Sequence, residues 1–149
     1  MPRNDERRQI DPEGRYPSGD DLRVVEYRAL KVLRARPDGV VTRTRDAIQI
    51  DWGDEEGIIA LVTAEALELR LAMVEWTGNH GSALSSRLWQ RFPWEKVENK
   101  KIETLLRRAQ EDRDAEFRNC AYCGCRTPRE RIVRDACHRC AIERLGIVF

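Results

Sequence analysis

Apolar side chains recur at helical spacing near the start of the chain. Between Asp21 and Arg36 they are separated by three and four residues, which lines one face of a helix. Pro37-Asp38-Gly39 then ends the predicted helix. The apolar positions are Leu22, Val25, Ala29, Leu30 and Leu33. Residues 1–19 contain prolines, glycines and alternating charges but almost no large apolar side chains, so we expect a disordered tail there.

The next segments mix two periodicities. Val40 to Trp52 is rich in β-branched residues and ends in an alternation of apolar and polar positions, which predicts a strand. Asp54 is a suitable N-cap for the apolar segment from Ile58 to Ala66, which we interpret as a helix. From Leu67 to Trp76 a period of two competes with a period of 3.6, and we favour a strand.

The middle of the chain has loop composition over residues 77–81, and Ser82 is placed to cap a short helix that Pro93 ends. From Asn99 to Arg118, scattered apolar residues among charges predict a long amphipathic helix. Core burial is the default for the aromatic residues before it, whereas a Trp94 left exposed after Pro93 would be a candidate contact with a protein partner.

Together these elements predict an α+β fold with a mostly helical body and a few short strands. The body spans residues 20–97, a connecting helix spans 98–118, and a separate C-terminal module spans 119–149. A helix, a strand, a helix and a strand in that order suggest a winged-helix variant for the body.

Composition limits the class of protein. A chain of 149 residues is long enough for one ordinary domain plus a small module. Its apolar runs are far shorter than the roughly 20 residues that a membrane helix needs, and its N-terminus lacks the apolar stretch of a secretory signal. We therefore expect a cytoplasmic protein without membrane contact. The net charge of +1 restricts nucleic-acid binding to local patches.

All five cysteines lie between positions 120 and 140. Cys120-Ala-Tyr-Cys123 and Cys137-His-Arg-Cys140 form two CxxC pairs thirteen residues apart, a spacing that suits one structural Zn²⁺ held by four thiolates. An iron–sulfur cluster is the alternative for four cysteines. We expect Cys125 to be a free thiol and His138 to point away from the metal.

Gly124 follows the first pair, residues Arg126 to Arg134 suit a short hairpin, and the second pair opens a predicted helix that Gly146 ends. This order over residues 119–149 resembles the treble-clef zinc fingers. Thr127-Pro128 after the first pair looks like the GATA type, although the spacer is shorter and no tryptophan follows Thr-Pro. The sequence Cys-His-Arg-Cys is similar to a zinc-bearing small-subunit ribosomal protein. Both relatives bind nucleic acid, so the resemblance implies such a contact here.

The charge of the module is consistent with that implication. From Arg118 to Arg144 there are seven arginines and three acids, an excess that four thiolates and one Zn²⁺ reduce by two. Arginine suits bidentate phosphate contacts. The candidate nucleic-acid contacts are Arg126, Arg129, Arg131, Arg134 and Arg139. The alternative is a solvated arginine surface that pairs with the acidic body.

Two features bear on catalysis. Carboxylates near Trp52 suit Mg²⁺ and phosphodiester cleavage, although such acids more often cap a helix. They are Asp46, Asp51, Asp54, Glu55 and Glu56. His80 lies on a glycine-flanked loop without an identifiable orienting acid. Because four cysteines leave zinc no open position, we assign no catalytic residue and no small-molecule substrate.

The sequence therefore predicts a small intracellular zinc protein that contacts nucleic acid or a ribonucleoprotein. A protein adaptor or regulatory subunit with a purely structural zinc is the alternative, and a metal-dependent nuclease is the third.

Overall fold

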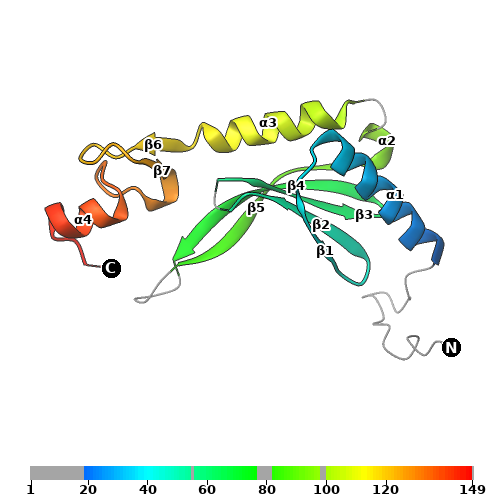
Figure 1. Cartoon of the computed structure of the whole chain (residues 1–149), viewed down its shortest axis with the longest axis horizontal. Helices are drawn as coiled ribbons and strands as arrows, with labels where there is room; N and C mark the ends of the chain where they lie inside the picture. Colours follow the sequence, from blue (N-terminus) through cyan, green and yellow to red (C-terminus); the bar gives the residue numbers. More distant parts are fainter. Residues whose placement is uncertain (1–18, 55, 77–81, 98–99, 149) are drawn as a thin grey trace.

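The computed structural model describes residues 19–54, 56–76, 82–97 and 100–148. Its centre is a five-stranded antiparallel sheet in which each strand pairs with the next one along the chain (Figure 1). The strands are β1 (Val40–Arg43), β2 (Ala47–Trp52), β3 (Ile58–Thr63), β4 (Ala66–Trp76) and β5 (Ser82–Pro93). β1 and β5 are consequently the two edges of the sheet.

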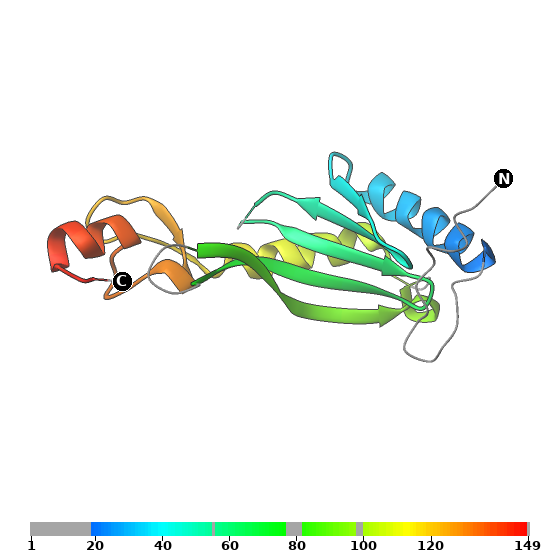
Figure 2. The same ribbon diagram turned by 90° about the horizontal axis from the view of Figure 1, so that it is seen from below.

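Helices cover one face of this sheet. Helix α1 (Gly19–Ala35) precedes the strands, and the short α2 (Trp94–Val97) leads from β5 to α3 (Ile102–Asp114). Both long helices lie on the same face, and the view from below shows the opposite face of the sheet with α3 behind it (Figure 2).

The register of the strands explains where the core lies. Ile48 pairs with Val62, Val62 with Leu67, and Leu67 with Phe92, so four buried side chains form one row across the sheet. Because side chains alternate between the faces of a strand, the intervening positions point away from the helices. There the more polar residues lie: Arg70, for example, makes an ion pair of 2.6 Å with Glu68 and donates a 2.8 Å hydrogen bond to Ser86 Oγ.

The C-terminal module follows α3. It comprises the paired strands β6 (Phe117–Asn119) and β7 (Arg126–Pro128), the 3₁₀ helix η2 (Arg129–Arg131) and helix α4 (His138–Leu145). The module lies at one end of an elongated molecule, beyond the C-terminal end of α3 (Figure 1). Gly146 ends α4 in the left-handed conformation, at φ 65°, which glycine adopts without a steric cost.

The prediction of a mostly helical body is wrong. The segment predicted as a helix from Ile58 to Ala66 is strand β3 with its following turn, the predicted helix from Ser82 to Phe92 is β5, and the single predicted strand from Val40 to Trp52 is two strands. In β3 the buried positions alternate with half-buried ones, and both sets are apolar. The sequence therefore lacks the alternation of apolar and polar residues that identifies a strand, and its continuous apolar run was interpreted as a helix. The order helix, strand, helix, strand that suggested a winged helix does not occur in the described part of the chain.

Other predictions are confirmed. Helix α1, strand β4 and the ending of α4 at Gly146 agree with the sequence pattern, and a helix occupies most of the predicted connection, although Phe117 belongs to β6.

The expected hairpin from Arg126 to Arg134 is replaced by pairing of β7 with β6. The loop with His80 and residue Glu55 lie outside the described residues. The predicted tail over residues 1–19 also lies outside them, except for Gly19, which begins α1.

The aromatic residues before α3 are mostly internal. Phe92 and Trp94 are buried, and Trp89 is half-buried against the core. The Trp94 indole Nε1 donates a 2.8 Å hydrogen bond to the Thr63 carbonyl. Trp94 is therefore a core residue, as expected by default, and the exposure that would make it a candidate partner contact does not occur. None of the described helices is both long and apolar enough to cross a membrane.

Candidate metal centre and the cleft beside it

Four cysteine sulfurs meet in the C-terminal module. The Sγ atoms of Cys120, Cys123, Cys137 and Cys140 all lie within 4.8 Å of one another. A tetrahedral site with Zn–S bonds of about 2.3 Å requires sulfurs about 3.8 Å apart, and the distance between Cys123 Sγ and Cys137 Sγ is 3.8 Å. An iron–sulfur cluster places several irons and sulfides between its cysteines. The compact sulfurs therefore fit one ion and do not fit a cluster.

A tight turn between β6 and β7 holds the first pair. Gly124 N donates to the Cys120 carbonyl at 2.9 Å, and Cys120 N donates to the Cys125 carbonyl at 2.9 Å, which closes the loop on itself. Gly124 has a φ of 75°, a conformation in which a side chain is strained. Tyr122 N points at the Cys120 sulfur at 3.4 Å. The backbone thus turns one thiol toward the centre and hydrogen-bonds it.

The second pair begins helix α4. Cys137 is the N-cap residue and Cys140 lies in the first turn, where the positive end of the helix dipole favours thiolates. Cys137 N donates to the Cys120 sulfur at 3.2 Å, so the two pairs are joined through the same sulfur. Just before Cys137, the chain turns between Val133 and Ala136, which exchange both backbone hydrogen bonds.

The thiols differ in acidity. Burial opposes ionisation of Cys120, but backbone N–H donors from Cys123, Cys137 and Tyr122 outweigh it and lower its pKa to about 6. Burial and the neighbouring thiols raise the pKa of Cys140 to about 12. Backbone and side-chain hydrogen bonds from Cys125 also lower the pKa of Cys123. Ionisation of Cys120 and Cys123 is thus favoured, while ionisation of Cys140 is opposed. A divalent cation is the group that would let all four ionise together, so the donor set fits Zn²⁺ chemically as well as geometrically.

Cys125 lies beside the cluster. Its sulfur is 3.2 Å from Cys123 Sγ and 3.4 Å from Thr127 Oγ1, and it is exposed. Neither Cys125 nor His138 belongs to the compact group of ligand atoms, although His138 directly follows Cys137 at the start of α4.

The predicted arginine contacts fall into two groups. Arg129, Arg134 and Arg139 are exposed, and Arg131 is half-buried. Arg126 instead turns toward the body, where its guanidinium makes ion pairs of 2.7 Å with Glu56 and 3.3 Å with Asp114 and lies 4.0 Å from the Phe117 ring centroid. The alternative of pairing between the module and the acidic body therefore holds for Arg126.

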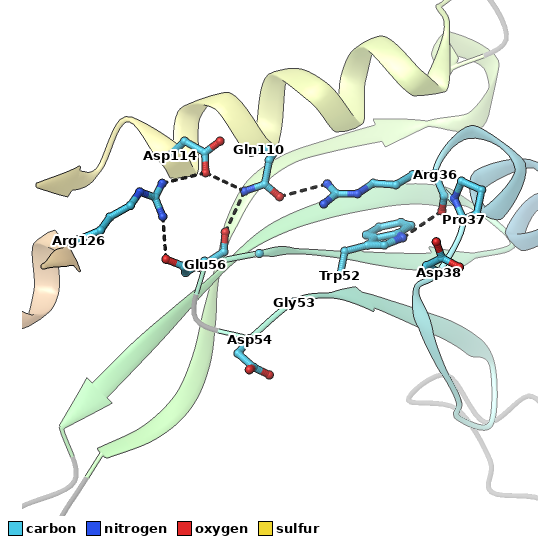
Figure 3. A pocket seen from close by; sticks show the side chains of 11 residues that line it. Arg36, Pro37, Asp38, Trp52, Gly53, Asp54, Glu56, Gln110, Asp114 and Arg126 are labelled. Carbon is cyan, nitrogen blue, oxygen red and sulfur yellow. Dashed lines mark hydrogen bonds and ion pairs between the residues drawn. The ribbon is translucent and has the colours of Figure 1, made fainter.

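These ion pairs form one wall of a cleft of about 840 Å³ between the body and the module (Figure 3). Gln110 on α3 links its two ends, because it accepts from Arg36 Nη1 at 3.1 Å and donates to the Glu56 carbonyl and to Asp114. Burial lowers the pKa of Arg36, and Asp114 opposes this effect. The cleft is thus lined by charged side chains that hydrogen-bond to one another, and these bonds link the segment after α1 and the segment between β2 and β3 to α3 and β7.

A buried ion pair makes the second connection between module and body. Arg113 at the end of α3 is completely buried and donates to both carboxylate oxygens of Glu130 in η2, at 2.6 and 3.2 Å. Glu130 Oε1 also accepts from Val74 N at 3.2 Å, on a part of β4 that extends beyond the end of β3. Burial raises the pKa of Glu130, but the hydrogen bonds from Arg113 and the backbone outweigh it and the pKa is lowered.

Sequence reasoning missed this pair. The only local signal was the position of Arg113, four residues after the buried Ala109, which continues the apolar stripe of α3. Nothing near Glu130 in the sequence indicates its partner, because the contact depends on how the module docks.

In the described part of the chain, the acids near Trp52 do not bring their carboxylate oxygens together as the four cysteines bring their sulfurs together. Asp51 accepts a hydrogen bond from Gln49, whereas Asp54 and Glu56 line the cleft. The arrangement gives no support to the nuclease hypothesis.

No protein-family model matches the chain, and no curated protein or solved structure matches it at a significant level.

Proposed function

We propose that the protein holds one structural Zn²⁺ through Cys120, Cys123, Cys137 and Cys140, and that the ordered module contacts nucleic acid, free or within a ribonucleoprotein. The observation that carries the metal assignment is the compact set of four sulfurs, all within 4.8 Å of one another. A turn followed by a helix that bears the second pair supports a treble-clef-like assignment of the module.

The metal has a clear structural task. Around the cysteines the buried apolar residues are few and small: Ala136 and Ala141 are buried, with Val133, Leu145 and Ile147 packed against them. Such a core is too small to order a segment by itself. Structural zinc in small fingers contributes an apparent binding free energy of about 10–16 kcal/mol, which is available to ordering the chain.

The exposed arginines support the nucleic-acid contact. Arg129, Arg134 and Arg139 are exposed. Glu130 directly follows Arg129 in the sequence, but its carboxylate already pairs with the buried Arg113. Its negative charge is therefore neutralised inside the molecule rather than at the surface. We retain Arg131 as a flanking contact and withdraw Arg126, whose guanidinium is occupied by Glu56 and Asp114.

One observation favours a protein partner as the second candidate. On the edge strand β5, two large apolar side chains are exposed on one face: Leu84 is 65% and Leu88 50% accessible. Exposed apolar residues gathered on one face mark contact surfaces. An adaptor would lose its partner upon Leu84→Ser with Leu88→Ser while its zinc content stayed unchanged.

The proposed function is tested by binding the zinc-loaded full chain to RNA, single-stranded DNA and duplex DNA over a range of salt concentrations. Replacing Arg129, Arg134 and Arg139 by glutamine should weaken binding and lower the slope of log K against log salt by about 2–3, since each phosphate contact contributes about 0.7–0.9. The same charge removed at Arg34, Lys96 and Arg108, which are exposed outside the module, is the control. Absence of binding by the wild type at low salt would refute the nucleic-acid part of the proposal.

A further inference from the structure

A second basic feature lies at the other end of α3 from the cysteines. A groove of about 600 Å³ runs between α1 and the beginning of α3, on the side of the molecule where α1, α2 and α3 come together (Figure 1). Tyr27 on α1 and Trp94 on α2 contribute to its walls. The sequence patterns gave no indication of this groove, because its residues come from two separate segments.

The groove is strongly positive. The charged side chains among its described lining residues are four cations, Arg28, Lys31, Lys100 and Lys101, and the carboxylate of Glu103. This balance contrasts with the net charge of +1 for the whole chain. The groove is also more basic than the zinc module, where thiolates reduce the excess of arginine.

One of the cations has a structural task. Arg28 Nη1 donates to the Ala64 carbonyl at 2.5 Å, and its guanidinium lies over the Trp94 ring, 4.8 Å from the centroid. Arg28 thereby holds α1 against the turn between β3 and β4. Its charge remains in the wall of the groove, but its hydrogen-bonding capacity is partly used.

The three lysines remain available. Lys31, Lys100 and Lys101 are exposed, and none of them makes an ion pair with a residue that the structure describes. Lys31 Nζ lies 4.8 Å from the Tyr27 ring centroid, and Lys100 Nζ lies 5.4 Å from that of Phe92. These contacts position the ammonium groups without neutralising them, unlike the ion pairs of Arg126.

Three ammonium groups around one concavity repel one another, and a bound polyanion relieves this repulsion. The backbone N–H groups at the start of α3, which has no side-chain cap at Lys101, add a small positive potential on the same side. Tyr27 is 58% exposed at the wall of the groove and offers a ring edge or face to a base or sugar. A nucleic acid supplies both parts of this combination, because its phosphates can pair with the lysines and its bases can stack on Tyr27.

Resting on the proposed function, we infer that this groove is a second contact for the phosphate backbone of the nucleic acid that the zinc module binds. The two contacts lie beyond opposite ends of α3, whose 13 residues alone span about 20 Å at 1.5 Å per residue. At about 3.4 Å per base pair along one strand, the length of this helix corresponds to about six base pairs, so a nucleic acid that reaches both contacts must be longer than that. A segment of 20 nucleotides exceeds this minimum length.

The experiment compares four zinc-loaded full-length proteins on 20-nucleotide RNA and DNA probes. They are the wild type, the groove variant with Lys31, Lys100 and Lys101 replaced by glutamine, the module variant with Arg129, Arg134 and Arg139 replaced by glutamine, and the control with Arg34, Lys96 and Arg108 replaced by glutamine. All three variants lose three positive charges at exposed positions. Circular dichroism and zinc content establish that each variant is folded and loaded.

If the inference holds, the groove variant binds at least tenfold more weakly than the control at low salt, and its salt slope falls by about 2–3 relative to the wild type. Equal affinities of the groove variant and the control would overturn the inference and leave the proposed function intact. Weak binding by the groove variant with unchanged binding by the module variant would support the groove and refute the module as the contact. Absence of binding by the wild type would refute the proposed function and remove the basis of the inference.

Discussion

The buried pair between Arg113 and Glu130 provides the sharpest test of how the module is attached to the body. Replacing Glu130 by glutamine removes the charge that faces a completely buried guanidinium while it keeps the shape of the side chain and one acceptor. Removal of one partner from a buried ion pair typically costs about 3–5 kcal/mol, because the remaining charge is desolvated without compensation.

The structure places Glu130→Gln near the lower end of that range. Glu116 Oε2 lies 3.5 Å from Arg113 Nη1 and compensates part of the charge. The Glu130 side chain is 15% accessible, so some solvent reaches the site. We expect Glu130→Gln to lower the free energy of unfolding by about 3 kcal/mol. We expect Arg113→Met to lower it by about 2 kcal/mol, because the Glu130 carboxylate that remains is partly solvated and still accepts a hydrogen bond from Val74 N.

The double variant tests whether Arg113 and Glu130 stabilise the protein through their contact with each other or independently. Arg113→Met with Glu130→Gln removes both charges, so we expect a total of about 2–3 kcal/mol rather than about 5, which corresponds to a coupling free energy of about 2–3 kcal/mol. Glu65→Gln is the matched control, because Glu65 and Arg91 form a 3.8 Å pair whose side chains are 83% and 51% accessible. Such an exposed pair contributes about 0–1 kcal/mol.

The assay is urea unfolding of the zinc-loaded protein, followed by tryptophan fluorescence from the body and by circular dichroism, with equal m-values required across variants. If Glu130→Gln costs no more than Glu65→Gln, or if the double variant loses the sum of the single losses, the reasoning about module docking is refuted.

Three further predictions concern the body and the effect of pH. Gly57→Ala should destabilise the fold by more than about 3 kcal/mol in urea unfolding, because the added Cβ would lie 1.7 Å from the Trp52 carbonyl oxygen, and a change below 1 kcal/mol would contradict this packing. Trp94→Phe should cost about 2 kcal/mol in the same assay, since it removes the hydrogen bond to the carbonyl of the half-buried Thr63 along with packed ring atoms, and an unchanged midpoint would show that the contact is unimportant. Because the folded-state pKa of Glu130 is lowered, its stabilisation is complete above the ordinary glutamate pKa of about 4.3 and is lost as the pH falls through the folded value. The stability difference between wild type and Glu130→Gln should therefore shrink upon acidification from pH 6 toward pH 3, and a constant difference would contradict the assigned charge.

The parts of the fold that sequence predicted were those with a clean local pattern. The apolar residues of helix α1 form one stripe. In β4 larger apolar residues alternate with other residues from Leu67 to Met73, and buried positions alternate with half-buried ones as far as Leu71, after which Ala72 is also buried. Strand β5 was mistaken for a helix because a bulge opposite Leu69 and Arg70 skips Trp89 and interrupts its alternation. A bulge depends on the partner strand, so its effect on the pattern is not visible in β5 alone.

The same distinction separates the two halves of the candidate site. The cysteine cluster was predictable because each CxxC pair is local and its spacing directly sets the direction of both sulfurs. The occupied state of Arg126 was not predictable, since Glu56 lies 70 residues away and the two meet across the cleft shown in Figure 3. The lysine groove was likewise hidden, because Lys31 and Lys100 come together through the packing of α1 on α3.

The most direct test of the central claim is the metal content of the reduced, purified protein together with the amide NMR spectrum before and after chelation. We expect one zinc per chain, and we expect chelation to remove the dispersed resonances of residues 119–148 while those of the sheet from Val40 to Pro93 persist. Cys125→Ser should retain the metal, whereas Cys123→Ser should lose it. A metal-free protein whose residues 119–148 remain fully dispersed, or a zinc that stays bound after Cys123→Ser and Cys137→Ser together, would contradict the account.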